Sequence, residues 1–315
     1  MFTRYDYKAG AIAVNVVNDI VALLTGTSDK TLLSVDCVQA STVIINDGVT
    51  RPAGWSLWDA AAGVRSVGVR ALNYDGSTYK YVVVSHNNTT TLFVKLYESW
   101  NATTHVGVNL AVGSDITGTT VNLALGGTLF ISASARIITT LGVISGVYDA
   151  TPNSIIEHSR DEPWDTPALN IPPTAYFSTS TSNIFSTFGN NGGSNAAAKP
   201  RVRNAGADTV GAGAFAMGML PYASYNGSNA NAIHNTSPYT KVRDSLYNAV
   251  HAFCPITLSQ AAAVGGEAQV FGKVFDMFVT TKSYGTSGDE VIFNGNSYFI
   301  MAASTSGVRL ALPKY

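Results

Sequence analysis

The first clear hydrophobic pattern in this chain has helical spacing. Ile12, Val16 and Ile20 recur every four residues, and Gly26 stands where a left-handed residue often ends a helix. The spacing predicts a short amphipathic helix whose clearest part is Asn15–Leu24. Its apolar stripe is narrow, so we expect it to cover either the edge of a sheet or a neighbouring subunit.

After this helix the pattern changes to strand-length runs rich in β-branched and aromatic residues. In the first half of the chain the expected strands are Leu32–Val38, Ser41–Ile45, Val64–Leu72, Tyr79–Val84, Thr91–Tyr97 and pieces of Val121–Ile144. Turn sequences separate them, and Tyr74–Ser77 is a candidate hairpin turn.

The second half repeats this pattern more weakly. We expect strands in Val210–Leu220 and at Tyr176-Phe177, a helix over Lys241–Phe253, and a terminal β-meander that turns at Asn294-Gly295. The predicted class is therefore mainly β, a β-rich α+β fold of antiparallel, sandwich-like sheets with few helices. The predicted organisation is a β-rich domain over residues 1–178, a Gly/Ser/Asn-rich loop or arm over 179–200, and a β-rich lobe over 201–315.

Composition removes several classes of function. Charged residues make up 12% of the chain and the net charge is −1, so we expect no nucleic-acid partner. No apolar run reaches the roughly 20 residues of a membrane span, and the N-terminus does not resemble a secretory signal. Cys37 and Cys254 stand alone, which favours buried reduced thiols over a disulfide or a zinc site.

One window concentrates charge. Six titratable side chains fall within residues 157–165. The simplest interpretation is a structural corner formed by Arg160, Asp161, Pro163, Trp164 and Asp165. In this corner Pro163 ends regular structure, Trp164 anchors the turn and Arg160 pairs with a carboxylate.

The same window leaves one catalytic alternative open. Glu157 and Asp161 could act as the paired carboxylates of a glycan-cleaving enzyme. Against this, the five histidines do not cluster, and no nucleophile elbow or phosphate- or dinucleotide-binding loop is present. We therefore expect no enzymatic activity, no cofactor and no metal.

Aromatic residues on expected loops leave three roles open: core, subunit interface or saccharide stacking. The candidate interface residues are Ile12, Val16, Ile20, Trp55, Trp58 and Trp100.

An ordered set of short segments over about residues 8 to 178 resembles virion structural proteins of tailed bacteriophages, in particular large contractile-tailed phages. These segments are Thr25-Gly26, Pro52–Trp55, Trp58–Ala61, Tyr79–Tyr81, Glu98–Asn101 with His105 and Gly107, Ser132–Arg136, Ser159–Asp165 and Pro172-Pro173. The resemblance implies particle assembly and no catalytic residues. It does not distinguish tail, neck, baseplate and capsid surface.

The main functional hypothesis is therefore a structural subunit of a phage particle, made in the host cytoplasm and located in the virion. Its expected partners are other virion proteins and further copies of itself in a symmetric assembly. The alternatives are a receptor- or glycan-binding tail adhesin and the glycan-cleaving tail enzyme.

Overall fold

The chain divides into two compact units, residues 1–157 with 314–315, and residues 158–313. The structure is a computed structural model. It describes residues 2–26, 33–37, 54–73, 76–110, 118–148, 153–157, 174–178, 217–220, 254–260, 269–281, 288–302 and 308–314. The predicted arm over 179–200, the predicted strand Ser41–Ile45 and the predicted helix Lys241–Phe253 lie outside these residues.

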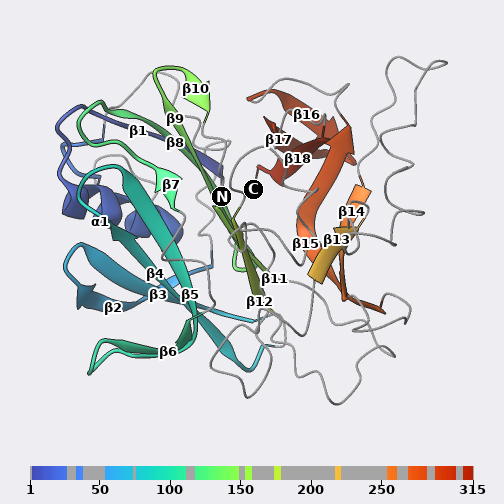
Figure 1. The fold of residues 1–315 in the computed structure, drawn as a ribbon, viewed down its shortest axis with the longest axis horizontal. Helices are drawn as coiled ribbons and strands as arrows, with labels where there is room; N and C mark the ends of the chain where they lie inside the picture. Colours follow the sequence, from blue (N-terminus) through green and yellow to red (C-terminus); the bar gives the residue numbers. More distant parts are fainter. Residues whose placement is uncertain are drawn as a thin grey trace, which may run out of the picture. The chain divides into compact units, whose positions relative to one another are not determined.

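The predicted fold class is confirmed: the described residues are mainly strand, the strand pairs within each unit are antiparallel, and one helix follows the first strand (Figure 1). The first unit contains β1 (Phe2–Tyr7), α1 (Ala13–Leu24), β2 (Ser56–Gly63), β3 (Ser66–Leu72), β4 (Tyr79–His86), β5 (Thr91–Asn101), β6 (Val106–Leu110), β7 (Thr119–Thr120), β8 (Gly127–Ala133), β9 (Ile137–Ile144), β10 (Val147–Tyr148) and β11 (Asn153–Glu157).

Two sheets build the first unit. One has the order β1-β8-β9-β11 with β10 paired to β9, and the other has the order β2-β3-β4-β5-β6 with β7 paired to β5. In the second sheet, β3 and β4 form a hairpin that pairs Leu72 with Tyr79, as the turn sequence around Gly76 predicts. We call this second sheet the β2–β6 sheet.

Helix α1 packs inside the first unit, against β3 and β4 of the β2–β6 sheet (Figure 1). It begins at Ala13, two residues before the predicted start, and Gly26 has a positive φ of 103° just beyond its end. Val16 and Ile20 are buried, whereas Ile12 at the helix start is 57% exposed. The apolar stripe therefore packs on a sheet within the chain, which was one of its two expected roles. It contacts the inner strands β3 and β4, not the edge of the sheet.

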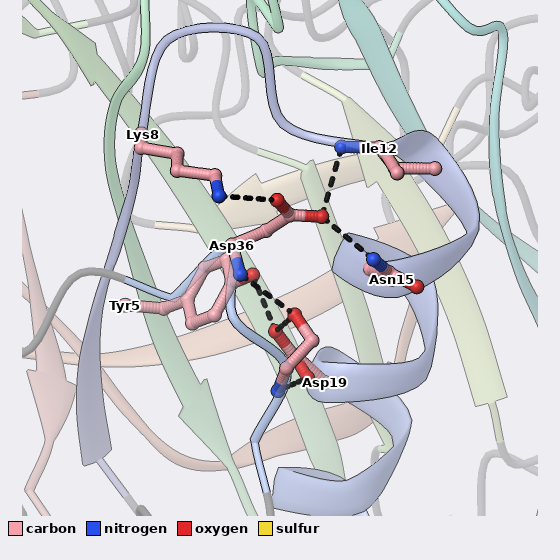
Figure 2. A network of polar contacts seen from close by, with 7 residues as sticks. Tyr5, Lys8, Ile12, Asn15, Asp19 and Asp36 are labelled. Carbon is pink, nitrogen blue, oxygen red and sulfur yellow. Dashed lines mark hydrogen bonds and ion pairs between the residues drawn. The ribbon is translucent and has the colours of Figure 1, made fainter.

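A distant carboxylate caps the start of α1. Ile12 at the N-cap position makes no side-chain capping bond. Instead, Asp36 Oδ2 accepts hydrogen bonds from the Ile12 backbone N–H at 2.9 Å and from Asn15 Nδ2 at 2.8 Å (Figure 2). Lys8 Nζ lies 3.2 Å from Asp36 Oδ1. Burial favours the neutral acid, but these donors outweigh it and lower the pKa of Asp36. The negative charge also suits the helix N-terminus.

A second buried carboxylate, Asp19, ties the middle of α1 to two other segments (Figure 2). It accepts hydrogen bonds from the Tyr5 hydroxyl at 2.7 Å and from both the backbone N–H and the hydroxyl of Ser34, at 2.6 and 2.7 Å. Burial, together with the neighbouring Asp19 charge, raises the pKa of Tyr5, so its hydroxyl stays a donor. Residues 33–37 therefore form a turn with a single bridge from Cys37 to Tyr7, and the strand predicted over Leu32–Val38 is wrong for them.

The second unit contains β12 (Thr174–Ser178), β13 (Met217–Leu220), β14 (Cys254–Gln260), β15 (Gln269–Thr281), β16 (Glu290–Phe293), β17 (Asn296–Ala302) and β18 (Val308–Pro313). Its sheet has the order β13-β14-β15-β18-β17-β16. The hairpin predicted at Asn294-Gly295 is confirmed: both residues have positive φ, 51° and 77°, and Phe293 pairs with Asn296.

Aromatic packing stabilises this C-terminal sheet. Tyr298, Ile300 and Ala311 form a buried cluster, and Phe278 and Phe293 pack against it. The Phe278 ring lies edge-on to Tyr298 and to Phe293, with ring centroids 5.5 and 5.8 Å apart. The β15–β18 pairing thus gains apolar contacts from the neighbouring β16–β17 hairpin.

Replacement of Asp36 by Ala should lower the free energy of unfolding by about 1–3 kcal/mol, because it removes the helix cap and leaves two donors unpaired. Urea denaturation measures this loss. Lys8→Ala is the matched control: Lys8 is 45% exposed, and such ion pairs contribute about 0–1 kcal/mol. Equal losses in the two variants would contradict the capping role.

A buried histidine gives the first unit a dependence on pH. His86 Nε2 lies 3.0 Å from the Val121 carbonyl oxygen, which can only accept, so Nε2 carries the proton. Nδ1 accepts a hydrogen bond from the Asn88 backbone N–H at 3.0 Å. Burial lowers the pKa of His86, the Val121 bond opposes this in part, and the Arg65 charge lowers it further.

The folded protein therefore binds a proton at His86 less readily than the unfolded chain does. The contribution of His86 to the free energy of unfolding should be constant above a pH of about 6.5 and should fall as the pH decreases below that value. Urea denaturation between pH 5 and pH 8 checks this. In His86→Asn, which does not titrate, the slope should be smaller, and an unchanged slope would contradict the assignment.

Candidate interaction site

The two faces of the β2–β6 sheet differ in character. Val69, Val82 and Val84 are buried on the face that packs on α1. On the other face, register places Arg70 opposite Tyr81, and Tyr81 opposite Tyr97. These three side chains are only partly buried. The strand alternation thus presents an aromatic and cationic row on the face that α1 does not cover.

Arg70 stands at the centre of this row. Its guanidinium carbon lies 3.7 Å from the centroid of the Trp58 ring and 4.4 Å from that of Tyr79. Tyr81 lies next to both rings, with centroids 6.0 Å from Trp58 and 6.4 Å from Tyr79. Tyr79 is exposed and Trp58 is partly buried. We call Trp58, Arg70, Tyr79, Tyr81 and Tyr97 the aromatic face.

A buried carboxylate holds one end of the aromatic face in place. Asp59 Oδ2 accepts a hydrogen bond from Trp100 Nε1 at 2.7 Å and lies 2.9 Å from His105 Nδ1. Its Oδ1 accepts from the Ala61 backbone N–H at 2.9 Å. The Trp100 ring meets Tyr97 edge-on, with centroids 4.9 Å apart. Asp59 on β2 thus links the β5–β6 hairpin to the strand at the opposite edge of the sheet.

The surroundings of Asp59 favour its charged form. Burial alone would raise its pKa, but the bonds from His105, Trp100 and Ala61 outweigh burial and lower it. His105 has a positive φ of 55° and its side chain is 44% exposed. In the described part of the chain no hydroxyl or thiol is hydrogen-bonded to His105. The Asp59–His105 pair therefore does not have the nucleophile of a Ser–His–Asp arrangement there.

Close packing also explains a glycine in this hairpin. A Cβ at Gly107 would lie 2.2 Å from the Tyr97 ring and 2.7 Å from that of Trp100. Any larger residue would push the two rings apart.

The candidate interface residues differ in how deeply they are buried. Trp55 is buried and its Nε1 donates to the Ser134 carbonyl oxygen at 2.8 Å. Trp100 is also buried, and Trp58 donates to the Trp100 carbonyl oxygen at 3.1 Å while its ring contributes to the aromatic face. With Val16 and Ile20 in the core, Ile12 and Trp58 are the candidates that keep substantial exposed surface.

The predicted corner residues Arg160, Asp161, Pro163, Trp164 and Asp165 lie outside the described residues, and the corner stays a prediction. Glu157 ends β11, but Asp161 is not described, so the carboxylate pair is untested.

Four residues of the aromatic face were not among the candidate interface residues predicted from the sequence: Arg70, Tyr79, Tyr81 and Tyr97. The alternation of Tyr79 and Tyr81 within one expected strand was a usable signal, because such residues share a face.

Among the described residues, no group of three or more His, Cys, Asp or Glu side chains is placed to hold a metal ion. Nor does the described part include a helix with the length and hydropathy needed to cross a membrane.

No protein-family model matches the chain, and no curated protein matches it.

Asp59 and Trp100 should be energetically coupled. Asp59→Ala and Trp100→Phe should each lower the free energy of unfolding by about 1–3 kcal/mol, because each leaves a buried polar partner unsatisfied. The double variant should lose at least about 0.5 kcal/mol less than the sum of the two single losses. Urea denaturation of all four proteins measures this, and strict additivity would contradict the bond.

Proposed function

We propose that this chain is a structural subunit of a bacteriophage particle, located in the tail, neck, baseplate or capsid surface. It acts through self-assembly and contacts with other virion proteins, without catalysis. The observation that carries this proposal is the aromatic face, because it stands on a sheet whose other face packs on α1 and because it remains partly exposed. Trp, Tyr and Arg are the residues most enriched in protein–protein interfaces and at their energetic centres.

Two features of the sequence support the same function. The charged fraction of 12% is low for a soluble domain, as expected where much of the surface is covered on assembly. The ordered segments that resemble phage virion proteins include Trp58–Ala61, Tyr79–Tyr81 and Glu98–Asn101, which supply Trp58, Asp59, Tyr79, Tyr81 and Trp100 to the aromatic face and its support.

A receptor- or glycan-binding tail adhesin is the second candidate. Tyr79 is 38% exposed, and an exposed aromatic ring can stack on a sugar. The two candidates differ in what covers the aromatic face inside the particle: a neighbouring virion protein in the first case, and solvent until receptor binding in the second.

Quantitative mass spectrometry of purified particles tests the proposal. The chain should be present at a fixed copy number in particles of the phage that encodes it. Joint replacement of Arg70 and Tyr79 by Ala should reduce incorporation by about tenfold or more, the effect of losing an interface hot spot.

Val64→Ala is the matched control, because Val64 is an exposed apolar residue in the β2–β3 turn of the same sheet. It should leave incorporation unchanged. Absence of the chain from wild-type particles would refute the proposal. Normal incorporation of the double variant together with loss of host attachment would favour the adhesin.

A further inference from the structure

Arg70 carries a charge that the described part of the protein does not neutralise. The ion pairs described in the first unit join Arg4 to Asp6, Lys8 to Asp36 and His105 to Asp59. In the described residues no carboxylate lies within ion-pair distance of Arg70. Its Nε is buried without a hydrogen-bond acceptor.

This arrangement is unusual because charged groups that lose water normally gain a partner. The negative faces of the Trp58 and Tyr79 rings attract the guanidinium. An aromatic ring does not, however, replace the acceptor that the buried Nε–H group of Arg70 requires. The buried carboxylate of Asp59 accepts hydrogen bonds from Trp100 and Ala61 and pairs with His105, and no ion pair joins it to Arg70.

The missing component is an anion of defined shape. A guanidinium matches a carboxylate through two parallel N–H···O bonds, and stacking on rings holds its plane in a fixed orientation. We propose that Arg70 binds an Asp or Glu side chain of a protein partner, and that the aromatic face packs around this contact. This inference rests on the proposed function and names the chemistry of the partner.

Neighbouring residues favour a protein over other acidic partners. Leu72 pairs with Tyr79 in the β3–β4 hairpin and is 43% exposed, so an aliphatic side chain borders the site. Sugar hydroxyls would need free polar groups, whereas Asp59 is buried and already bonded. Nucleic acid would need a row of cations. On this face, the described residues place two cationic side chains, Arg70 and Lys95.

Binding of short acidic probes to the full chain tests the inference. The probes are a blocked hexaglutamate peptide, a blocked hexaglutamine peptide, and an oligosaccharide of galacturonic acid. The readouts are intrinsic Trp fluorescence and the NMR signal of the Arg70 Nε–H group, measured at low salt. Hexaglutamate should bind and shift this signal, and the other two probes should bind at least about tenfold more weakly.

Variants connect the binding to Arg70. Arg70→Gln should weaken hexaglutamate binding by about tenfold or more. Arg70→Lys keeps the charge and should still weaken binding by severalfold, because it loses the planar fork. The matched control Arg65→Gln removes the same charge from the β2–β3 turn of this sheet and should change affinity by less than about twofold. Circular dichroism and urea denaturation verify that each variant is folded.

Three results would overturn the inference. Equal weakening by Arg65→Gln and Arg70→Gln would indicate non-specific attraction, and tighter binding of the galacturonate would indicate a saccharide site. Absence of hexaglutamate binding would remove the carboxylate site altogether. None of these results depends on particle composition, so hexaglutamate binding by a chain absent from particles would refute the proposed function alone.

Discussion

The buried carboxylates of Asp19 and Asp36 are the constraint on which the first unit depends. Both are removed from water in a chain with few charges, so each needs a full set of donors inside the protein. The donors come from β1, from the start of α1 and from residues 33–37. All of these hydrogen bonds can form together only when the three segments are packed as they are in this structure. The polar network thus fixes the position of a helix whose apolar contacts alone would tolerate sliding.

The position of α1 decides what the β2–β6 sheet can do. Because the helix covers the face with Val69, Val82 and Val84, that face is occupied by the chain's own core. The opposite face then carries its aromatic side chains with partial exposure, on strands that pack against the helix. A rigid element that presents Trp, Tyr and Arg side chains loses little entropy when a partner covers it.

Local sequence patterns predicted those parts of the fold that local interactions determine. The β-branched and aromatic runs predicted β3, β4 and β5. Asn294-Gly295 predicted a hairpin, because its two residues adopt positive φ. The pattern failed at residues 33–37, where Ser34 and Asp36 bond to α1 over a long sequence separation. The candidate site was predicted only in part for the same reason: Trp58 was selected, but its stacking on Arg70 depends on the register between β2 and β3.

Two charged residues on the paired strands β2 and β3, Asp59 and Arg70, show how a fold can separate stability from recognition. Asp59 receives donors from Trp100, His105 and Ala61, so its charge is satisfied within the chain and stabilises the β5–β6 hairpin. The guanidinium of Arg70 stacks on two aromatic rings, and no carboxylate of the described residues pairs with it. A stabilising charge is best paired internally, because a buried charge without a partner is costly. A charge used for recognition must keep donors available until the partner arrives. The Nε–H group of Arg70 is buried, but its terminal N–H groups make no hydrogen bond to the described residues, and the aromatic rings orient the guanidinium without using them.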